Sequence, residues 1–387
     1  MPMQIRNWVF LNTAFVALAL TAAPSARAEA ILYADDFDAG TSASAWTTVS
    51  QAGDYTADFA FDYSTRGIPP APNTTGGTTI GMHLTVNSTD AVAALDAVSA
   101  YPIGETFSGD HTLKFDMWLG YVGGAGGGAG STQFAEAGLL HSGTQAVWAN
   151  NAASDGQWFA VTGEGGDSND YRAYRNATLL GTNDAVLGAA DIPAVATGGN
   201  HTNVYYQYLF PSPTYETAGA PGKHWVEVEI SYIKGVLIWR LNSRIIAMRY
   251  EPNPGQASGN IMLGLMDTFT SISNPPADTF ALFDNVRVTA PDCNNSGVAD
   301  AAEIAAGTSL DCNCNAIPDE CETLGNADFD NDGDADLYDF QKFVVCMAGP
   351  NALPGAPAAC ASACLDAFDG DHDADVDLAD YAGLHAL

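Results

Sequence analysis

Acidic and amide side chains recur at a fixed spacing in the last quarter of the chain. A twelve-residue calcium loop supplies oxygen ligands from positions 1, 3, 5, 7, 9 and 12, and its position 6 turns sharply, which favours glycine. This template fits four segments: 292–303, 311–322, 328–339 and 369–380. One match in an Asp-rich chain would carry little weight, whereas four matches confined to one quarter of the chain predict Ca²⁺ as the cofactor.

Side chains at positions 1, 3, 5, 9 and 12 are the predicted metal ligands. They are Asp292, Asn294, Ser296, Asp300, Glu303, Asp311, Asn313, Asn315, Asp319, Glu322, Asp328, Asp330, Asp332, Asp336, Asp339, Asp369, Asp371, Asp373, Asp377 and Asp380. Crowded carboxylates repel one another without a cation, so we expect this region to fold fully only with calcium. Gly297 and Gly333 suit the turn at position 6, whereas Ala316 and Ala374 resist it.

The rest of the chain offers little catalytic patterning. Glu227 and Glu229 alternate on one face of a predicted strand, a spacing compatible with a glycosidase pair but more typical of a solvated sheet face. Glu164 and Asp167 lie in a glycine-rich turn that we expect them to build. The seven histidines show no spacing of a nucleophile–histidine site. We therefore assign no catalytic residue.

Aromatic side chains in turn-rich stretches are a second functional clue, because sugar rings stack on exposed Trp and Tyr. The candidates are Trp148, Trp158, Tyr171, Tyr174, Tyr205 and Tyr206. We expect most of them to lie in the core and some to line a groove that binds carbohydrate.

The elements that position these residues are short and rich in β-branched and aromatic side chains. Predicted strands occupy 78–87, 111–122, 157–163, 201–210, 224–233, 235–250, 259–267 and 279–290. Val226, Val228 and Ile230 alternate with polar residues, and no 3.6-residue pattern of helix length accompanies them. Many antiparallel strands without helical crossovers predict a sandwich or a barrel.

Three segments carry a family resemblance: Ile31–Asp38 (ILYADDFD), Leu241–Ala247 (LNSRIIA) and Ala281–Val288 (ALFDNVRV). They resemble the concanavalin A-like jelly roll of LamG and glucanase type over residues 29–290. The resemblance implies that the first and last strands lie side by side. It also implies that Asp35, Asp36 or Asp38 approaches Asp284, where the two could share a structural ion. The E-x-D-x-x-E motif of laminarinase-like relatives is absent.

The last two acidic loops each end in Asp-Leu-x-x-Asp before a short amphipathic segment. Residues 326–387 resemble a type I dockerin, an EF-hand-like calcium module that binds cohesin domains. The resemblance implies a cohesin-like or surface protein as partner, which would attach the chain to polysaccharide-degrading or surface assemblies. The recognition positions hold Leu337-Tyr338 and Leu378-Ala379 in place of Ser/Thr pairs. Residues 291–325 resemble the D-C-N-x-N-G-x-x-D repeats of exported planctomycete-type bacterial proteins.

Charge and cysteine divide the chain near Pro291. The formal net charge is −33, which makes nucleic acid an unfavourable partner. Residues 29–291 carry 26 acids, 10 bases and no cysteine, whereas residues 292–387 carry 20 acids, one base and all seven cysteines. The segments expected are a signal peptide (1–28), a β-sandwich (29–290), Cys-rich calcium repeats (291–325) and a dockerin-like module (326–387).

Cysteine use fits an oxidising compartment, and the apolar run in residues 8–20 is too short to span a membrane. Cys346 is expected to pair with Cys360 or Cys364. Zinc at Cys312-x-Cys314 is disfavoured because hard oxygen ligands dominate.

We expect a secreted or cell-surface calcium-binding protein. Its sandwich would be non-catalytic, with carbohydrate binding as a possible activity, and polysaccharide as a possible partner. The alternative is a glycoside hydrolase or polysaccharide lyase acting in polysaccharide catabolism.

Overall fold

The computed structural model describes residues 29–89, 95–180, 199–251, 254–322, 327–330, 335 and 337–384. The predicted signal peptide lies outside the described residues. No helix in these ranges is long and apolar enough to cross a membrane.

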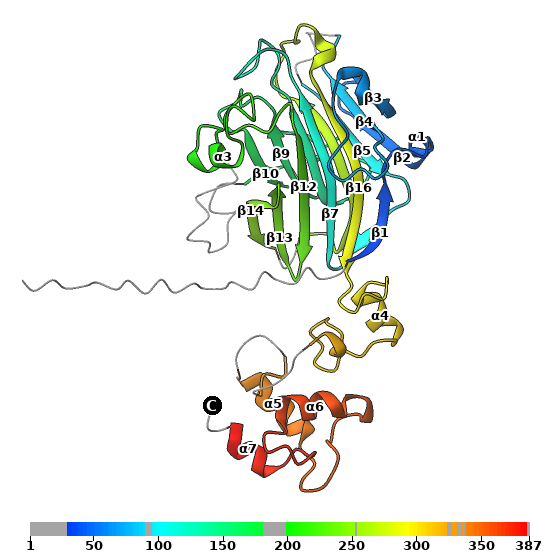
Figure 1. Cartoon of the computed structure of the whole chain (residues 1–387), viewed down its shortest axis with the longest axis vertical. Coiled ribbons are helices and arrows are strands. Elements are labelled where there is room, and N and C mark those ends of the chain that lie inside the picture. The colour runs from blue at the N-terminus through cyan, green and yellow to red at the C-terminus, as the bar shows by residue number, and fades with distance from the viewer. Residues whose placement is uncertain are drawn as a thin grey trace, which may run out of the picture.

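Two eight-stranded antiparallel sheets form the first part of the chain (Figure 1). Sheet A has the order β14-β13-β12-β7-β16-β4-β3, with β1 beside β16. Its strands are β1 (Glu29–Asp35), β3 (Tyr55–Asp62), β4 (Ile80–Val86), β7 (His111–Gly120), β12 (Trp225–Ile233), β13 (Val236–Leu241), β14 (Arg244–Tyr250) and β16 (Phe280–Pro291). The mainly β, antiparallel jelly-roll sandwich predicted from the sequence is confirmed.

Sheet B has the order β11-β10-β9-β8-β15-β5-β2, with β6 beside β15. Its strands are β2 (Trp46–Ser50), β5 (Asp96–Pro102), β6 (Phe107–Ser108), β8 (Phe134–His141), β9 (Gln157–Thr162), β10 (Tyr171–Arg175), β11 (Thr178–Leu179) and β15 (Ser258–Asp267). The two sheets bury one continuous apolar core between them.

Alternation along β7 shows how the sequence builds this core. Leu113, Phe115, Met117 and Leu119 face sheet B, and each is at most 3% exposed. Phe115 meets Phe283 of β16 edge to face, with ring centroids 5.6 Å apart. Burying each such side chain contributes roughly 1.5–3 kcal/mol. The residues between them therefore face outward, and they shape the outer surface of sheet A.

The first and last strands pair as the family resemblance implies. Residues 29–35 of β1 run antiparallel to residues 286–291 of β16, and the two strands lie side by side in Figure 1. The Asp35 carboxylate, however, accepts hydrogen bonds from Trp46 Nε1 and Ser42 Oγ, each at 2.8 Å. No group of three metal-ligating side chains surrounds Asp284 among the described residues.

The strand predicted for residues 201–210 is wrong. This segment forms the short helix α3 (Val204–Leu209), whose first turn is capped because the Asn203 side chain accepts a hydrogen bond from the Tyr205 N–H. The Tyr206 ring stacks on Tyr171 with centroids 3.8 Å apart. The ring contact and the cap thus outweigh the β propensity of a tyrosine-rich run.

The tail after Pro291 is helical and small. Its helices are α4 (Asp300–Ala306), α5 (Leu337–Cys346), α6 (Ala361–Phe368) and α7 (Leu378–Leu384), and α1 (Ser42–Ala45) is a further short helix in the sandwich region. Phe329, Phe343 and Phe368 form the tail's aromatic core, with Phe368 at 5.5 Å from each of the other two rings.

Three disulfides hold the tail: Cys293–Cys321, Cys312–Cys360 and Cys346–Cys364. The third is one of the two pairings that the sequence allowed for Cys346. The second joins the Cys-rich repeats to the dockerin-like segment. Cys314 is free and exposed, and Cys312 is unavailable to zinc because it is oxidised.

Candidate functional site

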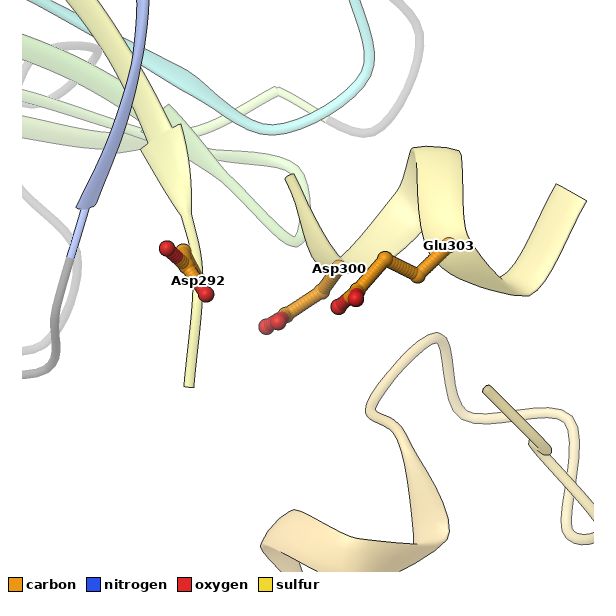
Figure 2. A group of neighbouring side chains, drawn as sticks. All are labelled: Asp292, Asp300 and Glu303. Atoms are coloured by element: carbon orange, nitrogen blue, oxygen red, sulfur yellow. The ribbon is translucent and has the colours of Figure 1, made fainter. Parts of the chain in front are cut away.

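The first acidic loop gathers its carboxylates where β16 ends and α4 begins. Asp292 follows β16, and Asp300 and Glu303 lie in the first turn of α4. The three side chains point toward one another (Figure 2), and ligand oxygens of all three lie within 4.8 Å of one another. All three residues are buried. Asn294 Nδ2 donates to Glu303 Oε2 at 3.1 Å, so position 3 also faces this cage.

The second loop repeats these contacts almost bond for bond. The position-9 carboxylate accepts from the backbone N–H of position 2 at 2.8 Å in both loops, through Asp300 in the first and Asp319 in the second. Asn313 Nδ2 donates to Glu322 Oε2 at 2.9 Å, as Asn294 does to Glu303. Burial raises the pKa of Asp319, and the charges of Asp311 and Glu320 act in the same direction. Two independent segments of sequence thus share these backbone and amide contacts, but Asp311, Asp319 and Glu322 do not form one of the groups of three converging ligands found among the described residues.

The third and fourth loops form another matched pair. Ligand oxygens of Asp328, Asp330 and Asp339 come within 4.8 Å of one another, as do those of Asp369, Asp371 and Asp380. Here the position-12 carboxylate accepts from the position-2 N–H, at 2.6 Å for Asp339 and 2.8 Å for Asp380. Aspartate is one methylene shorter than the glutamate of the first two loops, and in this pair it bonds directly to the loop backbone.

Other predicted ligands differ in how the structure places them. Asp332 and Asp336 lie outside the described residues, as does Gly333. Asp377 joins Asp380 in a further group with Asp375, a residue that the sequence template did not include. Asp373 is exposed, and its backbone N–H donates to Asp369 Oδ1 at 3.0 Å.

Position 6 has a left-handed backbone in each loop where it is described. The φ angles are 83° at Gly297, 66° at Ala316 and 70° at Ala374. The N–H of each of these residues donates to the position-1 carboxylate, at 2.8 to 3.0 Å. The register assigned from sequence therefore agrees with the turn geometry, whereas calcium binding itself stays a prediction.

A second group of acids crosses the outer face of sheet A. Asp284 of β16, Asp116 of β7 and Glu227 of β12 occupy one cross-strand row. Asn73, from the connection before β4, donates through Nδ2 to Asp116 Oδ1 at 2.7 Å and to Glu227 Oε1 at 3.0 Å. Asn285 Nδ2 donates to Asp116 Oδ2 at 2.8 Å. Asp284 and Asp116 are thus buried and hydrogen-bonded, whereas Glu227 is exposed.

Burial dominates the protonation of Asp284 and Asp116. It raises the pKa of Asp284 to about 7, and the charges of Asp116 and Asp38 act in the same direction. Tyr63 donates its hydroxyl to Asp284 Oδ2 at 2.9 Å. Burial also raises the pKa of Asp116, against hydrogen bonds from Asn73. Sequence patterning paired Glu227 with Glu229, and the family resemblance placed Asp284 near the first strand. Neither brought Asp284, Asp116 and Glu227 together, because the strands of this row are far apart in the chain.

An open pocket lies beside the acidic row at one end of sheet A. Its volume is about 390 Å³, and its lining includes Trp118, Tyr121, Arg66 and Lys223. Arg66 is paired with Asp278 at 2.8 Å, and Lys223 Nζ lies 4.1 Å from the Tyr121 ring centroid. The aromatic wall and the paired charges suit a ligand with both apolar and polar faces. Sequence patterning did not predict this pocket, because its lining residues come from segments far apart in the chain.

Most of the aromatic candidates lie in the core, as expected from the sequence. Trp158, Tyr171, Tyr174 and Tyr206 are at most 3% exposed. Trp158 stacks on Tyr174 with centroids 3.8 Å apart. Trp148 and Tyr205 are half-buried. None of the six lines the pocket at Trp118.

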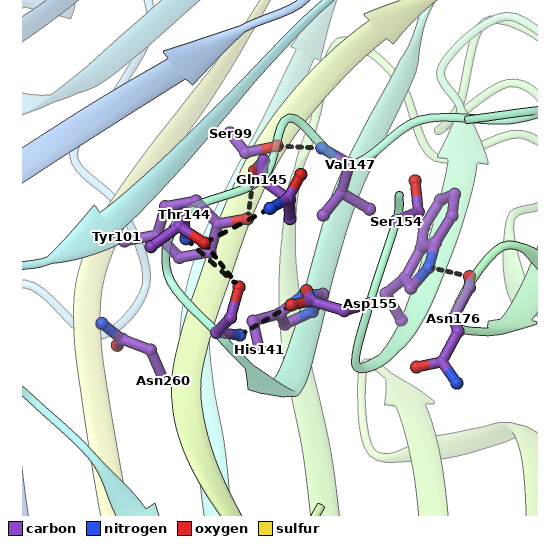
Figure 3. A network of polar contacts seen from close by, with 12 residues as sticks. Ser99, Tyr101, His141, Thr144, Gln145, Val147, Ser154, Asp155, Asn176 and Asn260 are labelled. Carbon is purple, nitrogen blue, oxygen red and sulfur yellow. Dashed lines mark hydrogen bonds and ion pairs between the residues drawn. The ribbon is translucent and has the colours of Figure 1, made fainter. Parts of the chain in front are cut away.

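A buried Asp–His pair lies on the other sheet. His141 Nδ1 is 3.1 Å from Asp155 Oδ1, and Figure 3 shows both side chains turned toward each other from β8 and the following loop. His141 is 1% exposed, and a Cβ at Gly138 would lie 2.5 Å from its Nε2. Burial lowers the pKa of His141. There is no room for a substrate at Nε2. The pair therefore holds the loop against sheet B.

The glycine-rich turn at Glu164 also has a structural explanation. Glu164 is 1% exposed, and burial raises its pKa to about 7. Gly127 packs directly over it with φ +74°, and a Cβ there would lie 2.6 Å from Glu164 Cγ and 2.3 Å from Ser131 Oγ. Gly127 is therefore needed for close packing at this corner.

Comparison with known proteins gives only distant similarities. No family model matches the chain, and no curated protein matches it. It resembles a Bacillus subtilis protein of unknown function with a galectin-like fold, at 12% identity and TM-score 0.35, over 68% of this chain and 97% of that one. It resembles a carbohydrate binding module from Bacillus subtilis at 12% identity and TM-score 0.28, over 61% and 94%. An alginate lyase from a Chlorella virus matches at 11% identity and TM-score 0.32, over 67% and 98%. Similarities this weak carry no argument about function.

Proposed function

We propose that residues 291–387 form a calcium-binding module of a secreted or cell-surface protein. The observation that carries this proposal is the convergence of carboxylates in three of the four predicted loops, each within 4.8 Å. Buried like charges at such distances are unfavourable without a cation, and carboxylate and amide oxygens are the ligands that Ca²⁺ prefers. The left-handed turn at position 6 adds support.

The expected ligands differ slightly between the loops. The first two use Asp at positions 1 and 9, Asn at position 3 and Glu at position 12, with Ser296 or Asn315 at position 5. The last two use aspartates throughout. A Glu at position 12 can bind calcium through both oxygens, as EF-hand loops do. The first loop also has three buried carboxylates. We therefore expect the first loop to bind calcium with the most regular geometry.

Calcium titration by calorimetry tests this function on the chain from Glu29 onward. We expect heat of binding that Asp292→Asn weakens, because it removes one charge from the first cage. Asp278→Asn is the matched control, since Asp278 is an exposed aspartate of the sandwich paired with Arg66. Absence of any calcium-dependent heat would exclude the proposal.

For the sandwich we propose non-catalytic binding of a polysaccharide at the pocket of Trp118. A half-exposed indole supplies an apolar face for a sugar ring, while Arg66 and Lys223 supply hydrogen-bond donors around it. Binding to a polysaccharide panel tests this proposal. Trp118→Ala should abolish retention, and Trp148→Ala, another half-buried tryptophan, should not.

A glycoside hydrolase or polysaccharide lyase remains the second candidate. The row of Asp284, Asp116 and Glu227 beside the pocket favours it, because one of these acids has its pKa raised to about 7. Against it, Asp284 and Asp116 are at most 1% exposed and are occupied by Asn73, Asn285 and Tyr63. Release of reducing ends or of unsaturated sugars, lost in Asp284→Asn, would favour the enzyme.

The exposed start of each dockerin-like helix supports a tethering role for the tail. Leu337 is 69% exposed on α5, and Leu378 is 72% exposed at the same position of α7. Two matched apolar side chains left in solvent would suit a protein partner, which we propose to be cohesin-like or a surface protein. Capture by an immobilised cohesin, reduced in a Leu337→Ser, Leu378→Ser double variant, would test this role.

A further inference from the structure

A second pocket opens on the outer face of sheet A, at the end of the sheet nearest the tail. Its volume is about 460 Å³, and its walls come from β12, β13, β7 and β16 together with the first residues of β1. Figure 1 shows β12, β7 and β16 side by side, with one end of these strands near the start of the tail at α4. The volume is within the range of small-molecule sites.

Three hydroxyl groups occupy one cross-strand row of this pocket. Ser231 pairs with Thr112, and Thr112 pairs with Thr289, so the row crosses three neighbouring strands. All three residues are at most 7% exposed. The Thr289 hydroxyl is buried and has no hydrogen-bond partner among the described residues. A buried hydroxyl without a partner is unfavourable, so this row is chemically incomplete as it stands.

Balanced ion pairs flank the hydroxyl row. Lys114 Nζ lies 2.6 Å from Glu29 Oε1, and Arg240 donates to Glu229 Oε1 at 2.5 Å. Each carboxylate is neutralised by its partner, in a chain whose net charge is −33. An anionic ligand would be repelled by the carboxylates of Glu29 and Glu229, and a cationic ligand would be repelled by Lys114 and Arg240. The pocket therefore favours a neutral ligand that both donates and accepts hydrogen bonds.

The remaining wall of the pocket is apolar, and the strands that form the pocket are already paired within sheet A. Val236 and Ile238 of β13 are half-buried and face the pocket beside Ser231. A peptide strand could not extend the sheet here, because β12, β7 and β16 each have neighbours on both sides. A sugar ring presents hydroxyls on its edge and C–H groups on its faces, which matches a polar row beside an aliphatic wall.

We propose that this pocket, which we call the hydroxyl pocket, binds a neutral saccharide unit. It shares its ligand class with the carbohydrate binding proposed at Trp118 and rests on that function in this respect. Its residues are separate, however, since none of the residues lining one pocket lines the other. The two sites at opposite ends of sheet A would let one sandwich contact a polysaccharide at two points.

Saturation-transfer NMR on the chain from Glu29 onward tests the hydroxyl pocket with maltose, cellobiose and lactose as neutral probes and digalacturonate as the charged one. We expect at least one neutral disaccharide to bind with Kd on the order of 1 mM. Ser231→Ala and Thr289→Val should each weaken it about five- to ten-fold, because each removes one hydrogen-bonding hydroxyl. Arg240→Met should weaken it as well, because it removes the donor that reaches both Glu229 Oε1 and Ser231 Oγ.

Thr85→Val is the matched control, because Thr85 faces outward on β4 of the same sheet and bonds to Thr56 Oγ1 at 2.7 Å. It should leave binding unchanged. Binding that is insensitive to Ser231→Ala and Thr289→Val but lost in Trp118→Ala would overturn the hydroxyl pocket and leave the proposed function standing. Binding that is lost in Ser231→Ala and Thr289→Val but unchanged in Trp118→Ala would overturn only the site at Trp118. No neutral binding by the unaltered chain, or equal binding of digalacturonate, would overturn the hydroxyl pocket.

Discussion

The sandwich and the tail are stabilised in different ways. The sandwich, which contains no cysteine, buries a continuous apolar core between two eight-stranded sheets. The tail has a much smaller core around Phe329, Phe343 and Phe368, and it adds three disulfides and four acidic loops. A short acidic segment cannot bury enough apolar surface to fold on that basis alone. Covalent links and, as we propose, calcium supply the remainder.

Reduction should separate the two regions most sharply. Each disulfide of a small domain contributes about 3 kcal/mol, so opening all three should unfold the tail. Residues 29–290 should be unaffected, because they hold no cysteine. Limited proteolysis after reduction in chelator, followed by mass spectrometry, measures this difference. Cleavage within the sandwich at the same rate as within the tail would contradict the claim that disulfides stabilise only the tail.

A substitution in the core should destabilise the sandwich and leave the tail unaffected. Phe283 is fully buried between the sheets, and Phe283→Ala should lower the free energy of unfolding of the sandwich by about 3–5 kcal/mol. Phe269→Ala is the matched control, since Phe269 is 39% exposed. Calcium binding by the tail should remain unchanged in both variants. Loss of calcium binding in Phe283→Ala would show that the tail depends on the sandwich for its fold.

The two regions should also respond to pH with opposite sign. Burial raises the pKa of Asp284 and Glu164 to about 7 and that of Asp267 to about 6, whereas these groups titrate near 4 in an unfolded chain. Between these values the folded sandwich binds more protons than the unfolded chain, so its stability falls as pH rises from about 4 to 7. Calcium affinity should rise over the same range, because the ligands must be deprotonated.

Thermal unfolding at pH 5 and pH 7.5 measures how the stability of the sandwich depends on pH. We expect a higher melting temperature at pH 5, corresponding to a difference in the free energy of unfolding on the order of a few kcal/mol. Asp284→Asn should reduce the slope, and Asp278→Asn, at an exposed site, should not. A melting temperature that rises with pH in the unaltered chain would show that these carboxyls are ionised when folded.

The smallest effect concerns the turn within the loops. Gly297 has φ +83° and open space where a Cβ would lie, so Gly297→Ala adds only backbone strain of about 1 kcal/mol. The first loop should then bind calcium about five-fold more weakly. Ala374→Gly should tighten the fourth loop by a similar factor, since Ala374 already holds φ +70°. Calorimetry on both variants checks this pair, and unchanged affinities would show that this turn does not limit binding.

The features that could be predicted from the sequence are those determined by residues close together in the chain. The acidic loops are set by spacing within twelve residues, so their turns and converging carboxylates could be predicted. The alternation in β12 was equally readable. The row of Asp284, Asp116 and Glu227 could not be foreseen, because it requires the order of three strands that lie far apart in sequence. Helix α3 was missed because the stack of Tyr206 on Tyr171 is a tertiary contact.

The disulfides show the same limit. A pairing of Cys346 within its own insert was expected from proximity in sequence, and Cys346–Cys364 spans 18 residues. Cys312–Cys360 spans 48 residues and links two segments that the family resemblances divide at residue 325. The domain boundary there stays a prediction, although this bond makes the two segments covalently one unit.

Hydrogen exchange of the whole chain from Glu29 onward, with calcium and with chelator, tests most directly whether calcium completes the fold of the tail alone. We expect calcium to protect backbone amides in 292–303, 311–322 and 369–380, where the loop N–H groups bond to the predicted ligands. Amides of β7 and β16 should exchange equally under both conditions. Identical exchange of the three loops with and without calcium would contradict the calcium-dependent fold.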